Sequence, residues 1–368
     1  MLRKVLMAAA FCALTGAASS AQSRYYVVTN DDSTSNSATV FNLNTSNGSM
    51  SQVAVLETGG QAEQGGYFAG VTQAISPGAA CVFVADGGSS DIAAFSKATG
   101  YKKVNNYGNP KLQAGDSMPM LESSDGTLLY AAYATTSNLV VWNIDSDCSL
   151  SIANIYSTPF LLGSMAITHD GGTLLVTYEV IKKAGSWSIS GSALTNQGTV
   201  AAIADVSGIA ATNDGTTVIM GTAYNASHPG TVVTASLPGF TNQTAWTPGP
   251  GYSAGSLVLS AAAAAGSGCL YIGNTGGGST GQAGVTGVKF TETPLNLTYV
   301  NNVTSSLATY VGNVATIGNS GNGLGVYAAE NPGYVGVYAA GSDCSVRLVK
   351  ETLDPQSSSL ISLSAWIQ

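Results

Sequence analysis

The sequence predicts an all-β protein built as a seven-bladed β-propeller of four-stranded blades, and three observations support this prediction. A short apolar phrase carrying Tyr, Val or Ala recurs along the chain next to turns rich in Gly, Asp, Ser and Asn. The phrase starts at residues 25, 81, 128, 174, 217, 269 and 325. These starts are roughly 43 to 56 residues apart, which is the period of one propeller blade. Only 9% of the residues are charged, and 45 are glycine, a composition that suits short strands and turns better than helices.

Blade 4 shows the expected order of strands most clearly. Ser164 to Thr168 reads as the innermost strand, Leu174 to Tyr178 as the second and Trp187 to Ile189 as the third. Asp170-Gly171 separates the first two strands, and Asp-Gly between apolar runs indicates a hairpin because glycine adopts positive φ without a steric penalty. Equivalent turns are expected at Asp125-Gly126 and Asp214-Gly215.

Blade 1 lacks an innermost strand of its own. The first phrase, Tyr25 to Asn30, is followed by a third strand at Thr39 to Leu43 and an outer strand at Ser51 to Leu56. The apolar tail Leu360 to Trp366 comes after the seventh copy of the phrase. We predict that this C-terminal strand pairs beside Tyr25 to Asn30, completes blade 1 and closes the ring, which removes an exposed sheet edge.

The first 21 residues have the layout of a secretory signal peptide, and residues 22–368 form the predicted propeller. Arg3 and Lys4 precede an apolar run from Val5 to Leu14, and a small-residue stretch ends at Ala21. No later stretch is both long and apolar enough to cross a bilayer. We therefore expect a secreted or periplasmic monomer without a membrane span.

The charge balance argues against nucleic acid as a partner. The net charge is -8, and only Arg24 and Arg347 remain as arginines once the predicted signal is removed. Such a chain has no basic stripe that could neutralise phosphates. The expected partner is instead an unidentified small molecule, glycan or protein.

The repeat suggests how the four cysteines that follow the predicted signal are paired. Cys81 and Cys269 begin the second strand of their blades, whereas Cys148 and Cys344 lie just after the third strand in Asp-Cys-Ser triplets. This arrangement favours Cys81 with Cys148 and Cys269 with Cys344, each joining neighbouring blades and worth about 3 to 4 kcal/mol in the chain-entropy model. Four free thiols are the alternative. We expect no metal site, because paired Cys-x-x-Cys spacing is absent and the chain has only 2 His, and we expect no cofactor.

The strand phrase resembles that of the lactonase-like (6-phosphogluconolactonase-like) seven-bladed propellers, in which it is often Tyr-Val-Thr-Asn. The most similar copies are Tyr26 to Asn30, Val84-Ala85-Asp86 and Tyr271 to Asn274. The resemblance covers nearly all of residues 24 to 366 and implies the fold more specifically than the activity, because the phrase consists of packing and turn residues.

The resemblance also implies what an active member would carry. Active relatives use His, Arg and Glu at the channel, in a stretch that runs Arg-His, then Asp-Gly, then an apolar strand and Asn-Glu. On blade 4, Asp170-Gly171 matches this stretch and Glu179 falls on its Glu, but Gly163 and Ser164 stand where Arg and His are expected. The missing cation argues against a conventional lactonase, because groups that stabilise an oxyanion supply several kcal/mol of transition-state binding.

The candidate functional residues lie in loops on the face opposite the Asp-Gly turns. A carboxylate there can act as a general base, and a lysine can bind an anion. Solvated loop residues are the alternative reading for each position, because loops are polar by default. The candidate catalytic bases are Glu179 and Glu330. The candidate ligand-binding residues are Glu63, Tyr67, Asp86, Asp116, Lys182 and His228.

Two functions from different classes follow from the sequence. The first is a secreted binding or interaction module that uses the channel mouth or the loop face. The second is a divergent lactonase-type hydrolase that acts on a small cyclic ester in the central channel. A mouth lined by Ser, Gly and Asn favours binding, and clustered Glu, Asp and His favour the enzyme.

Overall fold

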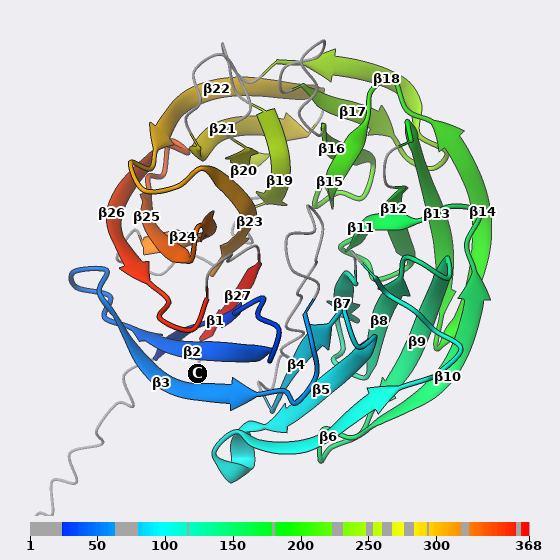
Figure 1. The fold of residues 1–368 in the computed structure, drawn as a ribbon. Helices are drawn as coiled ribbons and strands as arrows, with labels where there is room; N and C mark the ends of the chain where they lie inside the picture. Colours follow the sequence, from blue (N-terminus) through cyan, green and yellow to red (C-terminus); the bar gives the residue numbers. More distant parts are fainter. Residues whose placement is uncertain are drawn as a thin grey trace, which may run out of the picture.

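Seven antiparallel blades form a ring, with the innermost strands toward the centre and the outer strands at the rim (Figure 1). The computed structural model describes residues 24–62, 80–115, 118–178, 181–222, 231–247, 253–259, 267–275, 283–292, 294–317, 324–357 and 362–367. Within these ranges the only helix is a three-residue 3-10 helix, η1 (Lys97–Thr99). No helix in this part of the chain is long and apolar enough to span a membrane.

The first four blades occupy the N-terminal half of the chain. Blade 1 contains β27 (Leu363–Ile367), β1 (Tyr25–Asn30), β2 (Ser37–Leu43) and β3 (Met50–Glu57). Blade 2 shows β4 (Cys81–Asp86), β5 (Asp91–Ser96) and β6 (Lys102–Gly108), and residues 63–79 ahead of it lie outside the described ranges. Blade 3 contains β7 (Met120–Glu122), β8 (Leu128–Tyr133), β9 (Asn138–Ile144) and β10 (Leu150–Ser157). Blade 4 contains β11 (Leu162–Ile167), β12 (Thr173–Tyr178), β13 (Lys183–Ser190) and β14 (Ala193–Ala201).

The remaining three blades complete the ring. Blade 5 contains β15 (Val206–Ala211), β16 (Thr217–Thr222), β17 (Val232–Ser236) and β18 (Thr241–Trp246). Blade 6 contains β19 (Ser253–Leu259), β20 (Ser267–Thr275), β21 (Gly284–Glu292) and β22 (Leu295–Thr304). Blade 7 contains β23 (Tyr310–Thr316), β24 (Leu324–Asn331), β25 (Tyr334–Ala340) and β26 (Val346–Leu353). One bridge, Thr275 to Tyr310, joins blades 6 and 7 into a single eight-stranded sheet.

The C-terminal strand closes the ring as the sequence predicted. β27 pairs antiparallel with β1, with Val27 opposite Ala365 and Tyr26 opposite Trp366. The rings of Tyr26 and Trp366 stack 5.1 Å apart, and Lys97 of blade 2 places its Nζ 4.7 Å from the Trp366 ring. The closing strand is therefore held both by its own blade and by a cation-π contact from the next one.

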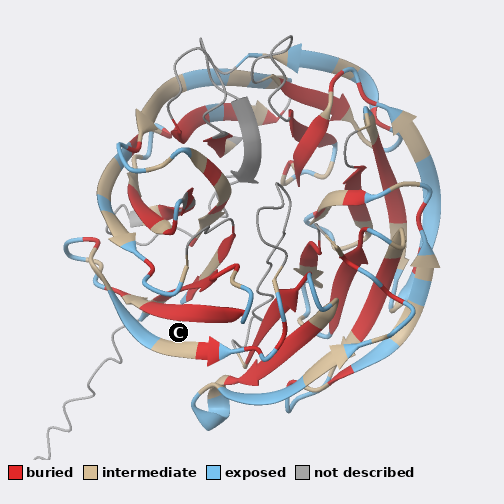
Figure 2. Cartoon of the chain, viewed as in Figure 1, coloured by how far each residue is buried: buried red, intermediate tan, exposed pale blue. Residues whose placement is uncertain are grey.

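The core lies between the blades. Figure 2 shows buried residues concentrated in the second and third strands, while the outer strands are largely exposed. Phe83 of blade 2 packs in one cluster with Tyr133 of blade 3, and Leu139 of blade 3 packs in another with Leu174 of blade 4. Each blade is therefore stabilised mainly by its two neighbours, which explains why the ring must close.

The turns and disulfides also follow the repeat. Gly126, Gly171 and Gly215 have φ values of 72°, 72° and 68°, so the predicted Asp-Gly turns use the conformation that favours glycine. Cys81 pairs with Cys148 across blades 2 and 3, and Cys269 pairs with Cys344 across blades 6 and 7. Their Cα–Cα distances of 5.5 and 5.2 Å are ordinary for disulfides. Both predicted pairings are present.

Candidate functional site

Three of the eight predicted site residues lie in the described part of the chain, in three different blades. Asp86 ends β4 in blade 2, Lys182 precedes β13 in blade 4, and Glu330 lies near the end of β24 in blade 7. The structure does not bring these three together. The other predicted residues, Glu63, Tyr67, Asp116, Glu179 and His228, lie outside the described ranges.

Asp86 is buried in the wall between blades 1 and 2. Its Oδ1 accepts a 2.7 Å hydrogen bond from Asn36 Nδ2, and the neighbouring Ala85 carbonyl accepts one from Asn30 Nδ2. Burial raises the pKa of Asp86 to about 7, and the bond from Asn36 opposes that rise. With 0% exposure, this carboxyl group fastens blade 1 to blade 2 and does not reach a ligand directly.

Glu330 is equally buried, inside blade 7. The Tyr338 hydroxyl donates a 2.6 Å hydrogen bond to its Oε1. Burial raises the pKa of Glu330 to about 8, the Tyr338 bond opposes this rise, and the charge of Glu351 adds to it. Close packing of Gly336 against the carboxyl group leaves no room for a side chain there. Glu330 is therefore protonated for much of the neutral range and points into the blade.

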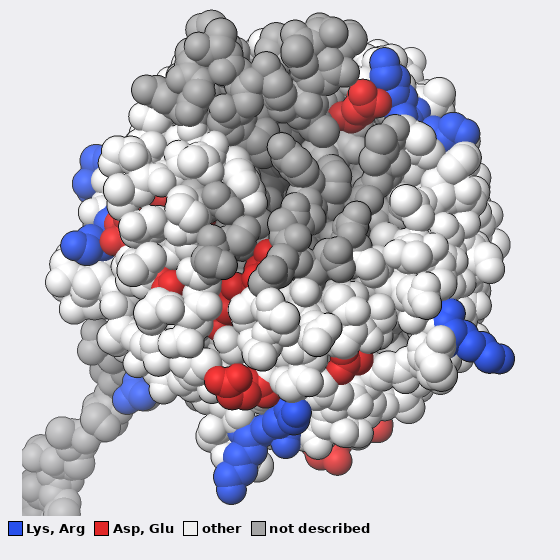
Figure 3. Space-filling model, viewed as in Figure 1, with Lys and Arg blue, Asp and Glu red and all other residues white. Residues whose placement is uncertain are grey.

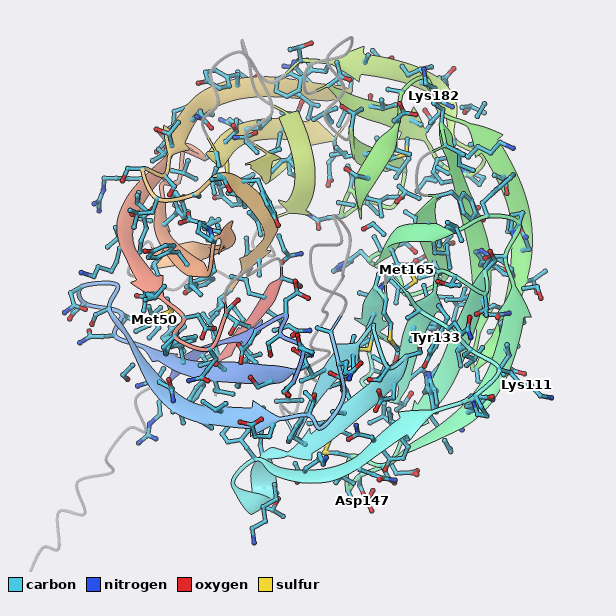
Figure 4. All side chains as sticks on the ribbon, viewed as in Figure 1. Met50, Lys111, Tyr133, Asp147, Met165 and Lys182 are labelled. Carbon is cyan, nitrogen blue, oxygen red and sulfur yellow. A yellow bond between two sulfur atoms is a disulfide. The ribbon has the colours of Figure 1, made fainter. Side chains whose placement is uncertain are left out.

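Lys182 is exposed and lies at the periphery of the ring, far from its centre (Figure 4). The next residue, Lys183, places its Nζ 4.0 Å from the Phe160 ring. Lys182, the predicted anion ligand, therefore faces solvent at the rim, and its neighbour Lys183 covers an aromatic ring.

Sequence reasoning missed a buried pair of carboxyl groups at the joint of blades 7 and 1. The Thr29 hydroxyl lies 2.6 Å from Asp354 Oδ2 and 3.3 Å from Asp31 Oδ1, and the hydroxyls of Ser37 and Thr39 donate to Asp31 Oδ2. Burial raises the pKa of Asp31 to about 8, and the charge of Asp354 adds to the rise. Thr29 and Asp354 are 325 residues apart, so only knowledge of the blade 1 closure could have placed them together.

A third carboxyl group that the sequence reasoning missed lies on an innermost strand. Glu122 ends β7, and burial followed by the charge of Asp125 raises its pKa to about 8. A carboxyl group with this pKa is suited to proton transfer near neutrality. Glu122 lies at the end of its strand that carries the Asp-Gly turn, opposite the face where the candidate bases were expected.

On the loop face, residues that the structure describes line an open pocket between blades 2 and 3. Its volume is about 520 Å³. Its wall consists of neutral residues: Gly88, Ser89, Ser90, Gly108, Asn109, Pro110, Leu112, Gln113, Gly115 and Thr135. The wall therefore offers hydroxyl, amide and backbone groups, and none of these ten residues carries a charge.

Backbone hydrogen bonds hold this pocket in shape. Ser90 Oγ accepts a 2.9 Å bond from the Ala114 N–H, and the Ala114 carbonyl accepts bonds from both the N–H and the hydroxyl of Thr135. Gly115 has φ 59°, and a Cβ there would collide with Thr135 Oγ1. These bonds hold the segment that precedes blade 3 against the loops on both sides of it. Because Gly115 has no side chain, this segment can pack against Thr135 without a clash.

The part of the face drawn in Figure 3 agrees with this composition. Most of the described surface is neither acidic nor basic, and the lysines and arginines lie scattered at the rim. Among the described residues no group of three or more His, Cys, Asp or Glu side chains is arranged to hold a metal ion.

Comparison with solved structures places the fold. The chain superposes on the periplasmic gluconolactonase of Pseudomonas aeruginosa with a TM-score of 0.70 and 16% identity, covering 94% of this chain and 99% of that one. The chain has the fold of the gluconolactonase-like seven-bladed propellers. Putative 6-phosphogluconolactonases from Bacteroides fragilis and Bacteroides uniformis each match with a TM-score of 0.68, at 14% and 11% identity. They cover 95% and 93% of this chain and 99% of their own.

At these identities the likeness defines the fold and leaves the activity open. No protein-family model and no curated protein matches the sequence. The residues of the site itself must therefore carry any argument about function.

Proposed function

We propose that this protein is an exported binding module whose pocket between blades 2 and 3 holds a neutral, hydroxyl-rich ligand of the glycan class. The observation that carries the proposal is the lining of that pocket, which combines neutral hydrogen-bonding groups with a volume of about 520 Å³. Pockets of this size accommodate small ligands, and a few placed polar groups orient them. A preformed wall also lowers the entropy lost on binding.

Two side chains are the expected direct contacts. The side-chain amide of Gln113 makes no hydrogen bond within the described residues, so both its donor and its acceptor are available. Asn109 uses only Oδ1, which accepts a 3.0 Å bond from the Lys111 N–H, and its Nδ2 remains available. Ser89, in contrast, is committed to the backbone N–H of Gln61 and to Asp91.

Calorimetric titration with maltose, cellobiose and N,N′-diacetylchitobiose tests the proposal. We expect one of these neutral sugars to bind the mature protein, and Gln113→Ala and Asn109→Ala each to weaken binding by about two- to tenfold, the worth of one hydrogen bond. Gln197→Ala is the matched control, because Gln197 is an exposed glutamine on the outer strand β14 of blade 4. Binding that neither pocket variant weakens, or no binding to any of the sugars, would refute this function.

A divergent lactonase-type hydrolase is the second candidate, and the observation that favours it is the likeness to gluconolactonase structures. On this reading Glu179 or Glu330 is the base. Purified protein would hydrolyse sugar lactones, and Glu179→Gln or Glu330→Gln would abolish turnover. Because Glu330 is fully buried, the folded state of its variant must be checked by thermal unfolding. Rates equal to the buffer rate for all lactones would eliminate the hydrolase.

We also propose export to an oxidising compartment. The two disulfides support this location, because such bonds persist outside the cytosol, and one structural neighbour is described as periplasmic. Mass spectrometry of the protein recovered from its host should show a mature N-terminus at Gln22, with both disulfides oxidised. An N-terminus at Met1 in the cell-internal fraction would contradict export.

A further inference from the structure

Blade 7 lies between blades 6 and 1 in the ring and presents a carboxyl group to each of them (Figure 1). Glu351, near the end of its outer strand β26, accepts a hydrogen bond from the Ser305 hydroxyl, in the segment that follows blade 6. Asp354, directly after β26, accepts a 2.6 Å bond from the Thr29 hydroxyl of blade 1. The end of a single strand therefore bonds to both neighbouring blades.

At the joint with blade 1, Asp354 meets the carboxyl group of Asp31, and both residues are 0% exposed. The Thr29 hydroxyl has three acceptors within reach: Asp354 Oδ2 at 2.6 Å, the Thr39 carbonyl at 3.2 Å and Asp31 Oδ1 at 3.3 Å. A hydroxyl group has only one proton to donate. A proton on one of the two carboxyl groups supplies a second donor, because the side chains of Asp31 and Asp354 lie within hydrogen-bonding reach of each other.

A second pair of carboxyl groups lies inside blade 7. Gly336 is opposite Glu351 in the β25–β26 ladder and packs so closely against Glu330 that a Cβ would collide with its Oε1. Glu330 is 0% exposed, and the same oxygen accepts a 2.6 Å bond from the Tyr338 hydroxyl. The negative charge of Glu351 acts on this buried group. Because Glu351 also bonds to Ser305, the second pair is connected to blade 6.

The groups that face the two pairs carry hydroxyls, apolar side chains or further acid. Asp32, next to Asp31, is acidic and buried, and burial raises the pKa of Tyr338 above its usual range, so its hydroxyl keeps its proton. The other residues beside the pairs on adjoining strands are Thr29, Ser37, Thr39, Val311 and Leu363. No lysine or arginine of the described chain forms an ion pair with these carboxyl groups, so a second negative charge in either pair stays uncompensated.

The protonation of both pairs changes just above neutrality. Burial raises the pKa of Asp31 and of Glu330 to about 8, and the charge of the paired carboxyl group adds to each rise. Each pair therefore keeps a proton up to neutrality and loses it in mildly alkaline solution. Two like charges then repel each other in a site that excludes water. Thr29, which bonds to the first pair, lies opposite Leu363 of the closing strand β27.

We propose that the two carboxyl pairs form a proton-dependent latch, which holds blade 7 and β27 in the closed ring and loosens them in alkaline solution. The latch is separate from the proposed ligand pocket, which lies between blades 2 and 3 and shares no residue with it. Either proposal can therefore fail while the other stands.

Hydrogen exchange followed by mass spectrometry tests the latch on the full mature protein, because it measures local opening strand by strand. Protection factors are corrected for the intrinsic exchange rate at each pH and compared at pH 6, 7 and 8.5. The reference is β12 and β13 of blade 4, which contain none of the four carboxyl groups. We expect β24 to β27 to lose at least about tenfold more protection between pH 6 and pH 8.5 than the reference does.

Asp31→Asn and Glu330→Gln place an uncharged amide of the same shape in each pair. The amide oxygen still accepts hydrogen bonds, and the amide nitrogen donates to the neighbouring carboxylate as the proton does. Each variant should reduce the excess loss of protection in blade 7 by about threefold or more, and the double variant should nearly abolish it. Asp86→Asn is the matched control, because Asp86 is also buried with a raised pKa but lies between blades 1 and 2. Its variant should keep the wild-type loss in blade 7.

Protection of blade 4 at pH 6 shows whether each variant is folded, and the comparison of blades within the wild type decides the matter without any variant. Two results would each overturn the proposal. One is a loss of protection that is equal in blades 4 and 7, which reports global unfolding. The other is a loss in blade 7 that the double variant retains in full.

Discussion

Aspartates at opposite ends of the blade hairpins have opposite electrostatic environments. Asp86, at the loop-face end of β4, is buried and its pKa rises to about 7. Asp170, in the Asp-Gly turn of blade 4, is exposed, and hydrogen bonds from Thr168 and Gly172 lower its pKa. Aspartate is therefore partly neutral at pH 7 where it is buried between blades, and it is a fixed charge where it lies in an exposed turn.

A carboxylate near a propeller mouth is therefore weak evidence for catalysis. Asp31, Asp86 and Glu330 all have a raised pKa in the range that proton transfer requires, yet each is fully buried among neighbouring strands. Burial changes their pKa, but it also removes them from contact with a substrate. The exposed turn aspartates have the access that the buried groups lack.

The largest expected effect is a loss of stability as the pH rises from 5 to 8. In the folded protein Asp31, Asp86, Glu122 and Glu330 have a pKa of about 7 to 8, well above the ordinary values of 3.8 for Asp and 4.5 for Glu. As the pH rises, the unfolded chain therefore releases these protons at a lower pH than the folded protein does. The stabilisation from these groups is complete below about pH 4 and decreases until they ionise in the folded protein near pH 7 to 8. A difference of one in pKa between the folded and the unfolded chain is worth about 1.4 kcal/mol, so each of these groups accounts for a loss of about 3 to 4 kcal/mol between pH 5 and pH 8.

Urea unfolding at pH 5, 6, 7 and 8 measures this loss. The series stops at pH 8 because burial lowers the pKa of Lys97 to about 8. Above that pH the folded protein loses the buried positive charge of Lys97, and this deprotonation would add stability. Constant or rising stability between pH 5 and pH 8 would show that the buried carboxyl groups titrate normally.

A smaller effect isolates one group. Asp86→Asn keeps an acceptor for Asn36 but removes the ionisation. The stability advantage of the variant over the wild type should grow by about 3 kcal/mol between pH 5 and pH 8, because the pKa of Asp86 is about 7 in the folded protein and 3.8 in the unfolded chain. The same measurement on Asp170→Asn should show no such gain. An equal pH slope in the wild type and Asp86→Asn would break the comparison.

The smallest effect concerns the turn aspartates. Asp214 Oδ1 accepts bonds from the Thr212 hydroxyl and the Thr216 N–H, and Oδ2 accepts one from the Thr216 hydroxyl. Asp214→Ala removes these acceptors and should cost about 0.5 to 1.5 kcal/mol in urea unfolding at pH 7. Asp214→Asn should recover most of that loss, because the amide oxygen still accepts. If Asp214→Asn lost as much stability as Asp214→Ala, the charge of Asp214 would contribute more to stability than its hydrogen bonds within the turn.

The architecture was predictable because local signals repeat along the chain. Asp-Gly turns fixed the strand order at Gly126, Gly171 and Gly215, and the equivalent positions of Cys81 and Cys269 indicated which cysteines meet. The polar residues Gly87 to Ser90 directly follow Asp86 in the sequence, but the place of this loop in a pocket with Asn109 and Gln113 depends on contacts between blades. The repeat predicts which strand of a blade a residue occupies. It does not predict which residues of the neighbouring blade that residue contacts.

Burial was the property that the sequence could not supply. Asp86 and Glu330 stand at the ends of strands next to polar loops, where exposed side chains are common. The residues that bond to them when buried are Asn36, just before β2, and Tyr338, in β25. The pair of Asp31 and Asp354 joins the two ends of the chain. Such groups become recognisable only after the ring is closed.

Calorimetric titration at two pH values and two salt concentrations tests whether the pocket between blades 2 and 3 binds its ligand through neutral groups alone. The ligand is whichever of maltose, cellobiose and N,N′-diacetylchitobiose binds most tightly, measured at pH 6 and pH 8 and at low and high salt. Because the ten residues lining the pocket between blades 2 and 3 are neutral, its affinity should stay within about twofold across all four conditions, while Gln113→Ala weakens it throughout. An affinity that changes about tenfold with pH or salt would show that charged groups take part in binding and would refute a neutral binding site.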